Sequence, residues 1–221
     1  MVTFETYIKR FHKNQKENDL TINELKEAFF SLKTNKSPGY DDINFNVIRQ
    51  CFGSLHQPLL HVFSQSLKTG IFPDKLKIAR VSPLFKKGDD SELGNYRPIS
   101  VLPCFSKVLE KMMYNRLYKH LSENNLLYKK QFGFQQKHST EHAIIQLIDQ
   151  INKNFEKSQY TLGIFIDLTK AFDTVDHNIL ISKLENYGVR GVNLKWFKSY
   201  LNNRKQFISY NNSSTSYKNM T

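Results

Sequence analysis

The stretch "TLGIFIDLTKAFDTVDHNIL", residues 161–180, decides the fold class of this chain. Its run from Leu162 to Ile166 is continuously apolar, which predicts a strand that is covered on both faces. Asp167 follows the run directly, and an apolar pattern of helical spacing comes after it at Ile179–Leu184. A buried strand followed by a helix predicts a chain of mixed α and β structure.

Asp167 is the candidate for chemistry in this stretch. The end of a rigid strand is a good place for a cation ligand, because Mg²⁺ prefers carboxylate and phosphate oxygens. An aspartate at such a position is more often a helix N-cap or a turn residue, so Asp167 alone leaves both interpretations open. Asp173 and Asp176 favour the structural roles, in the turn and at the start of the following helix.

Composition and charge narrow the class of protein. The 221 residues are 39% hydrophobic and 13% aromatic, which argues against disorder and allows one large domain or two small ones. The net charge is +12, and after His177 there are seven Lys or Arg residues against one acidic residue, Glu185. Such an excess favours a polyanionic partner, most often nucleic acid, with surface lysines that only keep the protein soluble as the plainer alternative.

Cellular context follows from what the sequence lacks. It has no signal peptide, no other targeting signal and no apolar run of membrane-spanning length. Cys51 and Cys104 lack metal-ligand spacing and are expected to be buried thiols. We therefore expect an intracellular protein without a membrane partner, in the nucleus or the cytoplasm.

Further elements are predicted by spacing and capping signals. Thr21 and Glu24 match a capping box and predict a helix after Thr21. Apolar stripes predict other helices around residues 55–67, 105–121, 143–151, 179–184 and 196–201. "ARVSPLF" reads as a strand whose proline suits an end or an edge. "KQFISYNNSSTSYKNM" reads as a hairpin with Asn211 and Asn212 in its turn.

A second constellation surrounds "KKGDDSELGNYRPISVLP", residues 86–103, which predicts two β arms joined by a polar, glycine-containing tip. Folding back across this tip would bring Lys86 and Lys87 near Arg97. Arginine offers a bidentate fork to phosphate oxygens and lysine offers a mobile charge, so the arrangement suits a triphosphate. The alternative is a solvated hairpin tip decorated with basic residues.

Four motifs together resemble the reverse transcriptase domain of non-LTR (LINE-type) retrotransposons. They are "NKSPGYDDI" (35–43), "NYRPISVLPCFSKVLEKMMYNRL" (95–117), "QFGFQQKHSTEHAI" (131–144) and "FIDLTKAFDTVDHNILISKLENYGVRGVNLKWFKSYLNNRKQ" (165–206). They occur in the order that the family has. The resemblance implies an α+β right-hand polymerase fold, of which this chain carries the fingers and part of the palm.

The resemblance also implies domain limits and an activity. Residues 1–34 would be an N-terminal helical extension, 35–157 the fingers, and 158–221 a partial palm with the first catalytic motif. The activity implied is RNA-directed DNA polymerisation. The partners would be an RNA template, a DNA primer and deoxynucleoside triphosphates, and the cofactor would be Mg²⁺, two ions in the complete site.

Roles follow from the resemblance residue by residue. Asp167 matches the first palm aspartate, a ligand of both metals, and Leu168 would offer its backbone carbonyl to one of them. Phe172 matches the aromatic steric gate that excludes a ribose 2′-hydroxyl. Lys86 and Arg97 would lie over the incoming triphosphate, with Lys87 the lesser candidate.

The loop "QFGFQQKHST" matches a finger insertion near the template, through Gln131, Phe132 and Lys137. Its basic and aromatic side chains suit single-stranded nucleic acid. The alternative for Phe132 and Phe134 is packing in the core beneath a surface loop.

One departure from the family limits what is expected of this chain. The family's later aromatic–Ala–Asp–Asp motif does not occur in the sequence, and the Asp-Asp pairs at 41–42 and 89–90 lie in expected loops. We expect a truncated polymerase without the remaining palm and the thumb, and without activity by itself. The alternative is a non-enzymatic, basic nucleic-acid-binding relic or domesticated module.

Overall fold

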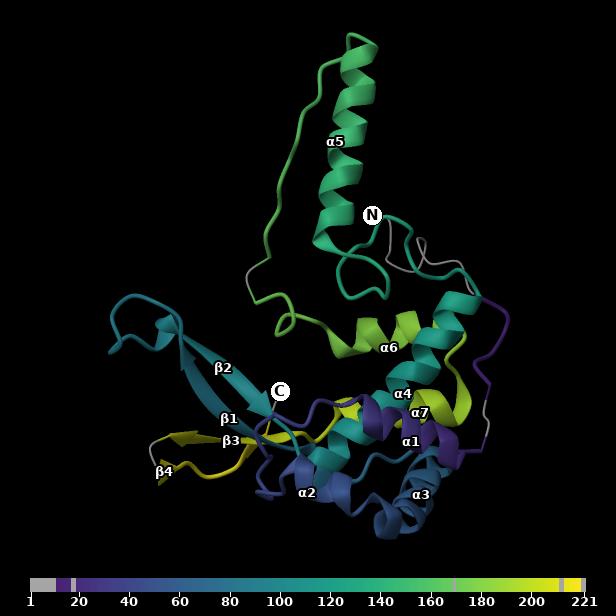
Figure 1. Ribbon diagram of the computed structural model, residues 1–221, viewed down its shortest axis with the longest axis vertical. Helices are drawn as coiled ribbons and strands as arrows, with labels where there is room; N and C mark the ends of the chain where they lie inside the picture. The colour runs from purple at the N-terminus through teal and green to yellow at the C-terminus, as the bar shows by residue number, and fades with distance from the viewer. Residues whose placement is uncertain (1–10, 17–18, 169, 211–212, 220–221) are drawn as a thin grey trace. The chain divides into compact units, whose positions relative to one another are not determined.

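The computed structural model describes residues 11–16, 19–168, 170–210 and 213–219 (Figure 1). Its contacts divide the chain into two compact units: unit 1 contains Met1–His120 and His177–Thr221, and unit 2 contains Leu121–Asp176. Helices and a small mixed sheet agree with the expected α+β class. The assignment of 35–157 to fingers and 158–221 to palm stays a prediction.

Unit 1 is built mainly from helices, and all of them except α2 were predicted from the sequence. They are α1 (Ile22–Ser31), α2 (Phe45–Gln50), α3 (Phe52–Thr69), α4 (Cys104–Glu123), α6 (His177–Asn186) and α7 (Gly191–Leu201), with short 3-10 turns η2 (Asp74–Lys77) and η3 (Leu93–Asn95). The capping box is confirmed, because the Glu24 amide donates to Thr21 Oγ1 and the Thr21 amide donates to the Glu24 carboxylate. Gly70 ends α3 at φ 67°, in the left-handed conformation that glycine adopts most easily.

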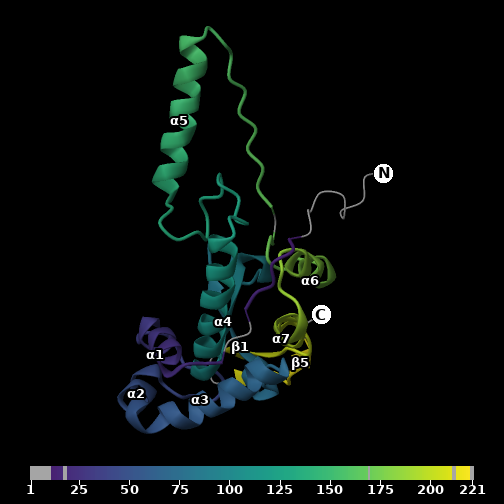
Figure 2. The same cartoon turned by 90° about the vertical axis from the view of Figure 1, so that its right-hand side faces the viewer.

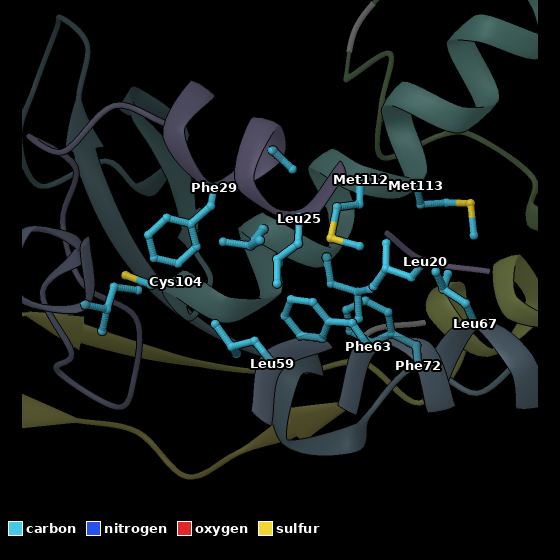
Figure 3. Packing of buried hydrophobic residues seen from close by; sticks show 14 of the residues in the cluster. Leu20, Leu25, Phe29, Leu59, Phe63, Leu67, Phe72, Cys104, Met112 and Met113 are labelled. Carbon is cyan, nitrogen blue, oxygen red and sulfur yellow. The ribbon is translucent and has the colours of Figure 1, made fainter. Parts of the chain in front are cut away.

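The core of unit 1 lies between α1, α3, α4 and α7. Phe29, Phe63 and Met112 are almost completely buried, and Figure 3 shows how side chains from α1, α3 and α4 meet. Figure 2 shows α6 beside α7, where Leu184 and Leu194 belong to a smaller apolar cluster. The predicted helix faces around 55–67 and 105–121 are therefore the faces that pack.

Trp196 joins α7 to α3. Its side chain is 1% exposed, its ring stacks on Tyr200, and its Nε1–H donates to Ser66 Oγ at 3.1 Å. The Ser66 hydroxyl donates in turn to the Ile71 carbonyl at 2.6 Å. Trp196 is therefore a core residue.

The sheet follows the order β2-β1-β3-β4, from β1 (Ile78–Phe85), β2 (Tyr96–Val101), β3 (Lys205–Tyr210) and β4 (Ser213–Ser214), with β5 (Lys218–Asn219) also paired to β3. β1 and β2 are antiparallel, and β1 and β3 are parallel. The predicted ribbon and the C-terminal hairpin are confirmed. The expected turn residues of that hairpin, 211–212, lie outside the described residues.

Two prolines face each other in the ribbon without disrupting it. Pro83 pairs with Pro98, and the Lys86 amide donates to the Asn95 carbonyl. Counting back from that bonded pair places the two prolines in a pair that exchanges no ladder hydrogen bonds. β1 pairs with β3 only from Ile78 to Val81, so Pro83 has no strand neighbour on its other side. The proline therefore lies where only one edge of the strand is paired.

A polar cluster closes the junction of α4 and α7. The Ser106 hydroxyl donates to Glu110 Oε1 at 3.3 Å, and Arg204 stacks over the Tyr200 ring at 4.7 Å while donating to the Tyr200 carbonyl. Burial raises the pKa of Glu110, against the opposing charge of Arg204. Burial, with the Glu110 carboxyl nearby, also raises the pKa of Tyr200 to about 12.

Unit 2 contains one helix in its described residues, α5 (Thr140–Glu156). The helix is predicted correctly, but its apolar stripe is exposed, with Ile144, Leu147 and Ile148 all about half accessible. In Figure 1 the chain leaves the end of α5 and continues as an extended segment.

The strand expected at Leu162–Ile166 is not formed. These residues have no strand assignment, and the apolar side chains of the run are 77–88% exposed. High β-propensity does not make a strand without partner strands and covering side chains, and no described segment supplies either one. The expectation that both faces are covered is therefore wrong.

Two smaller findings complete the comparison. Cys104 is buried as expected, but Cys51 is exposed, because it lies at the corner between α2 and α3. Among the helices in the described part of the chain, none has the length and apolarity that crossing a bilayer requires.

The core predicts unequal effects of two adjacent phenylalanines. Phe29 is fully buried, whereas Phe30 is 38% exposed. We expect Phe29→Ala to lower the free energy of unfolding by about 3–5 kcal/mol, because it removes a whole ring from a packed core. The matched control, Phe30→Ala, should cost clearly less. Urea denaturation measures both, and equal losses would contradict the placement of α1.

The raised pKa of Glu110 predicts a pH dependence of stability. A folded-state pKa above the unfolded value means that the folded chain holds the proton more tightly. Stability relative to a Glu110→Gln variant should then be highest below the ordinary carboxyl pKa and should fall as pH rises from there through the raised folded-state pKa. Urea denaturation of both proteins across this range measures the difference, and a difference that does not change with pH would refute the assignment.

Candidate nucleotide-binding ribbon and nucleic-acid interface

The register of the β1–β2 ribbon places two candidate cations on one face. Leu84 pairs with Arg97, and the bond from the Lys86 amide to the Asn95 carbonyl continues this register by two residues. Side chains two apart on a strand share a face, so Lys86 lies diagonally across from Arg97. Both are exposed. Lys87 follows in the bend of the tip, beyond the paired part of the ribbon, so the register does not place it beside Arg97.

The tip of the ribbon is hydrogen-bonded to the residues at which β2 begins. Asn95 Nδ2 donates to the Asp89 carbonyl and the Tyr96 hydroxyl donates to the Asp90 carbonyl, each at 2.8 Å. The Ser91 amide and hydroxyl donate to Asp89 Oδ1, and these bonds, the amide first, lower the pKa of that carboxyl. The tip therefore holds the Asp89 carboxylate within its own turn.

The base of the ribbon is tied to the loop at 35–43, through a residue that sequence reasoning missed. Arg80 in β1 donates from Nη1 to Asp42 Oδ1 and from Nη2 to the Pro38 carbonyl, both at 2.7 Å. Lys107 donates to the Ser37 carbonyl at 3.2 Å. The sequence shows a basic residue in an expected strand and acidic residues in an expected loop. It gives no indication that these two distant positions are in contact.

Asp167 and Leu168 lie in the extended segment of unit 2. Leu168 is 69% exposed and Asp167 is also exposed. Within the described residues there is no group of three His, Cys, Asp or Glu side chains close enough to hold a metal ion. One exposed carboxylate does not fit a pair of catalytic Mg²⁺ ions, so we derive no reaction step through metal from these residues.

Phe172 contacts the candidate template loop within unit 2. Its ring meets Phe134 edge to face, with centroids 5.7 Å apart, and both rings are strongly exposed. The alternative of a core position is therefore wrong for Phe134. Phe132 is partly buried against His138 at 5.7 Å.

The other two loop candidates are accessible. Gln131 Nε2 donates to the Gly133 carbonyl at 3.0 Å, and Lys137 is exposed with a φ of 62°. The structure thus groups Gln131, Phe132 and Lys137 in one loop and brings Phe172 to it. Lys86 and Arg97 belong to unit 1, so the two groups are described separately.

The comparisons identify the family. The family model described as "Reverse transcriptase (RNA-dependent DNA polymerase)" matches residues 85–220, more than half of the chain. The chain therefore belongs to the reverse transcriptase family.

Named relatives narrow the group to polymerases of non-LTR retrotransposons. The chain is 33% identical over 88% of its length to the "Probable RNA-directed DNA polymerase from transposon BS" of Drosophila melanogaster. It is 31% identical over 74% of its length to the "RNA-directed DNA polymerase from mobile element jockey" of the same species. These matches cover 21% and 18% of the relatives, so the chain spans about a fifth of their length.

A glycine in the loop at 35–43 predicts a steric effect. A Cβ on Gly39 would lie 2.5 Å from the Pro103 backbone nitrogen, whereas a Cβ on Gly94 would meet nothing within 4 Å. We expect Gly39→Ala to lower the free energy of unfolding by about 1–3 kcal/mol, since the loop must move off the start of α4. Gly94→Ala should change it by less than about 0.5 kcal/mol. Thermal or urea unfolding measures both, and a tolerated Gly39→Ala would show that the loop does not pack there.

Proposed function

We propose that this chain is the part of a retrotransposon reverse transcriptase that receives the incoming deoxynucleotide and the RNA template. The observation that carries the proposal is the pair Lys86 and Arg97 on one face of the β1–β2 ribbon. A guanidinium fork and an ammonium group, both accessible, can share the oxygens of one triphosphate. Charge neutralisation there would stabilise the negative charge that develops during phosphoryl transfer.

In the same proposal the protein has the right-hand polymerase arrangement, with the ribbon in the fingers. The ring of Phe172 excludes an incoming nucleotide that carries a ribose 2′-hydroxyl. The loop carrying Gln131, Phe132 and Lys137 contacts the template. The exposed rings of unit 2 support this role, because aromatic faces stack on unpaired bases.

Asp167 would supply one ligand to Mg²⁺ in the complete enzyme, together with the Leu168 carbonyl. In this chain Asp167 lies on an unpaired segment that does not fix its direction. We therefore propose binding of nucleic acid and nucleotide, without DNA synthesis by this chain alone.

The triphosphate assignment is tested with three single variants. We expect Lys86→Ala and Arg97→Ala each to weaken dTTP binding by roughly tenfold, the effect of losing a charge-assisted hydrogen bond. Lys87→Ala is the matched control, because it removes the same charge from the bend of the tip, beyond the paired part of the ribbon, and it should change binding by less than about twofold. Fluorescence titration with a labelled nucleotide measures all three. An equal loss in the Lys87 variant would reduce the ribbon to a nonspecific basic tip.

The enzyme proposal competes with a non-enzymatic binding module, which the net charge of +12 favours. The dTTP titration above separates them, because a module that binds only nucleic acid would show no loss specific to Lys86→Ala and Arg97→Ala. Two further assays with the wild-type chain and Asp167→Ala test whether the chain binds RNA and whether it synthesises DNA. RNA binding that weakens with salt and survives the substitution is expected in both cases. Mg²⁺- and dNTP-dependent primer extension by the wild-type chain, lost in Asp167→Ala, would show that the chain is active alone and would contradict our proposal on that point.

A further inference from the structure

Residues 11–15 form a strap, an irregular segment that lies against the turn between α6 and α7. The Phe11 amide donates to the Asn186 carbonyl at 2.7 Å, and the Gln15 amide donates to the Gly188 carbonyl at 2.8 Å. Asn186 is the last residue of α6, where a helix leaves carbonyl groups without a partner inside the helix. The strap therefore caps the C-terminal end of α6.

One arginine fastens the strap to the start of α7. Arg190, the N-cap residue of that helix, donates from Nη1 to Asn14 Oδ1 at 2.6 Å and from Nη2 to the Phe11 carbonyl. The Phe11 ring also meets the ring of His120 in α4 edge to face, with centroids 6.1 Å apart. His120 Nε2 in turn bonds to the Tyr187 carbonyl at 2.8 Å. The strap thus connects the ends of three helices.

The glycine at position 188 makes the close approach of the strap possible. Its φ is 92°, and a Cβ at this position would overlap the carbonyl oxygen of Lys13 and lie 3.1 Å from His120 Nε2. A side chain larger than hydrogen would push the strap off the turn. The strap therefore fits this turn specifically.

The docked strap is held less firmly than its hydrogen bonds alone suggest. Gln15 Oε1 and Arg190 Nε are both buried, and neither has a hydrogen-bond partner among the described residues. Buried polar groups without partners destabilise the state that buries them. Residues 12–14 are exposed, so the strap also buries little apolar surface. Such specific but weak attachment is what a segment that docks and releases requires.

A small apolar cluster provides the other contacts that hold α6. Leu184, Val189 and Leu194 are buried in it, and Leu117 of α4 packs against them. This cluster is distinct from the larger core that contains Trp196. α6 therefore depends on few apolar contacts, and the strap supplies the polar contacts at its C-terminal end.

We propose that the strap is a clasp for α6. When the strap is docked, α6 is held against α4 and α7. When it is released, α6 opens together with it while the Trp196 core stays folded. α6 begins at His177, directly after the segment that carries Asp167 and Phe172. The clasp thereby controls how that segment is attached to unit 1, a consequence that rests on the function proposed above for Asp167 and Phe172.

Opposite charges at position 14 test the clasp in the full chain. Asn14→Lys places an ammonium group beside the Arg190 guanidinium and should release the strap. Amides of the strap and of α6 should then exchange roughly tenfold faster, while those of α3 are unchanged. Asn14→Asp adds an attractive charge at the same place and should slow the same amides. His12→Lys is the matched control, because it adds a charge at an exposed neighbouring residue and should change nothing.

Amide hydrogen exchange measures all four proteins, and fluorescence of Trp196, the only tryptophan, reports whether the core stays folded. Faster exchange of Gln15 without faster exchange of α6, equal acceleration of α3 and α6, or an unprotected Gln15 amide in the wild-type chain would each overturn the proposal. So would an effect of His12→Lys equal to that of Asn14→Lys. The measurement uses no nucleotide, so a failed dTTP titration would refute the ribbon assignment and leave this result unaffected.

Discussion

The packing of Trp196, a residue of α7, against α3 is the interaction on which the described fold of unit 1 depends. Its indole is buried and its N–H donates to Ser66 Oγ, so the one polar group of this side chain is paired inside the core. The Phe72 amide donates to Ser199 Oγ at 3.0 Å and adds a second link from the end of α3 to α7. α7 leads directly into β3, so its position decides where β3 meets β1.

Because β1 is anchored to the packed helices, a ribbon with an exposed tip can still hold Lys86 and Arg97 in defined positions. The base of β1 is held on one side by β3 and tied by Arg80 to the loop at 35–43. The outer part needs only its ladder with β2, including the bond between Lys86 and Asn95. Stabilisation is thus concentrated in the packed helices, while the residues that would meet phosphate project from a short, well-paired support.

Unit 2 differs from unit 1, because its candidate residues are not supported by packed or paired elements. Its candidate residues, Asp167 and Phe172, lie on exposed backbone whose apolar side chains contact water. A carboxylate can serve a metal only when its direction is fixed, and a strand fixes direction only when it is paired. The lack of pairing at residues 162–166 therefore leaves Asp167 without a fixed geometry.

The sequence predicted what local rules determine. The capping box of Thr21, the helix around 55–67 and the ribbon at 86–103 each depend on neighbouring residues or on a short hairpin. It failed where the outcome depends on distant partners. The apolar run at Leu162–Ile166 has the composition of a strand but lacks the neighbouring strands that would pair with it. α5 has an apolar stripe of the kind that usually packs in a core, but no described side chains cover it.

The contact at the base of the ribbon was missed for the same reason, namely that its two residues are far apart in the sequence. Arg80 and Asp42 are 38 positions apart, and only the fold brings them together. The family resemblance supplied candidate roles for Asp167 and Phe172, but a role carried by sequence does not fix the geometry of the side chain that would perform it.

Amide hydrogen exchange of the dilute, monomeric chain tests the central claim most directly, namely that a rigid unit 1 presents the ribbon while residues 161–167 are unpaired. We expect strong protection in α3 and α7 and protection of the Lys86 amide, with unprotected exchange from Leu162 to Ile166. Protection of Leu162–Ile166 equal to that of α7 in the monomer would contradict it, because those residues would then form a paired strand.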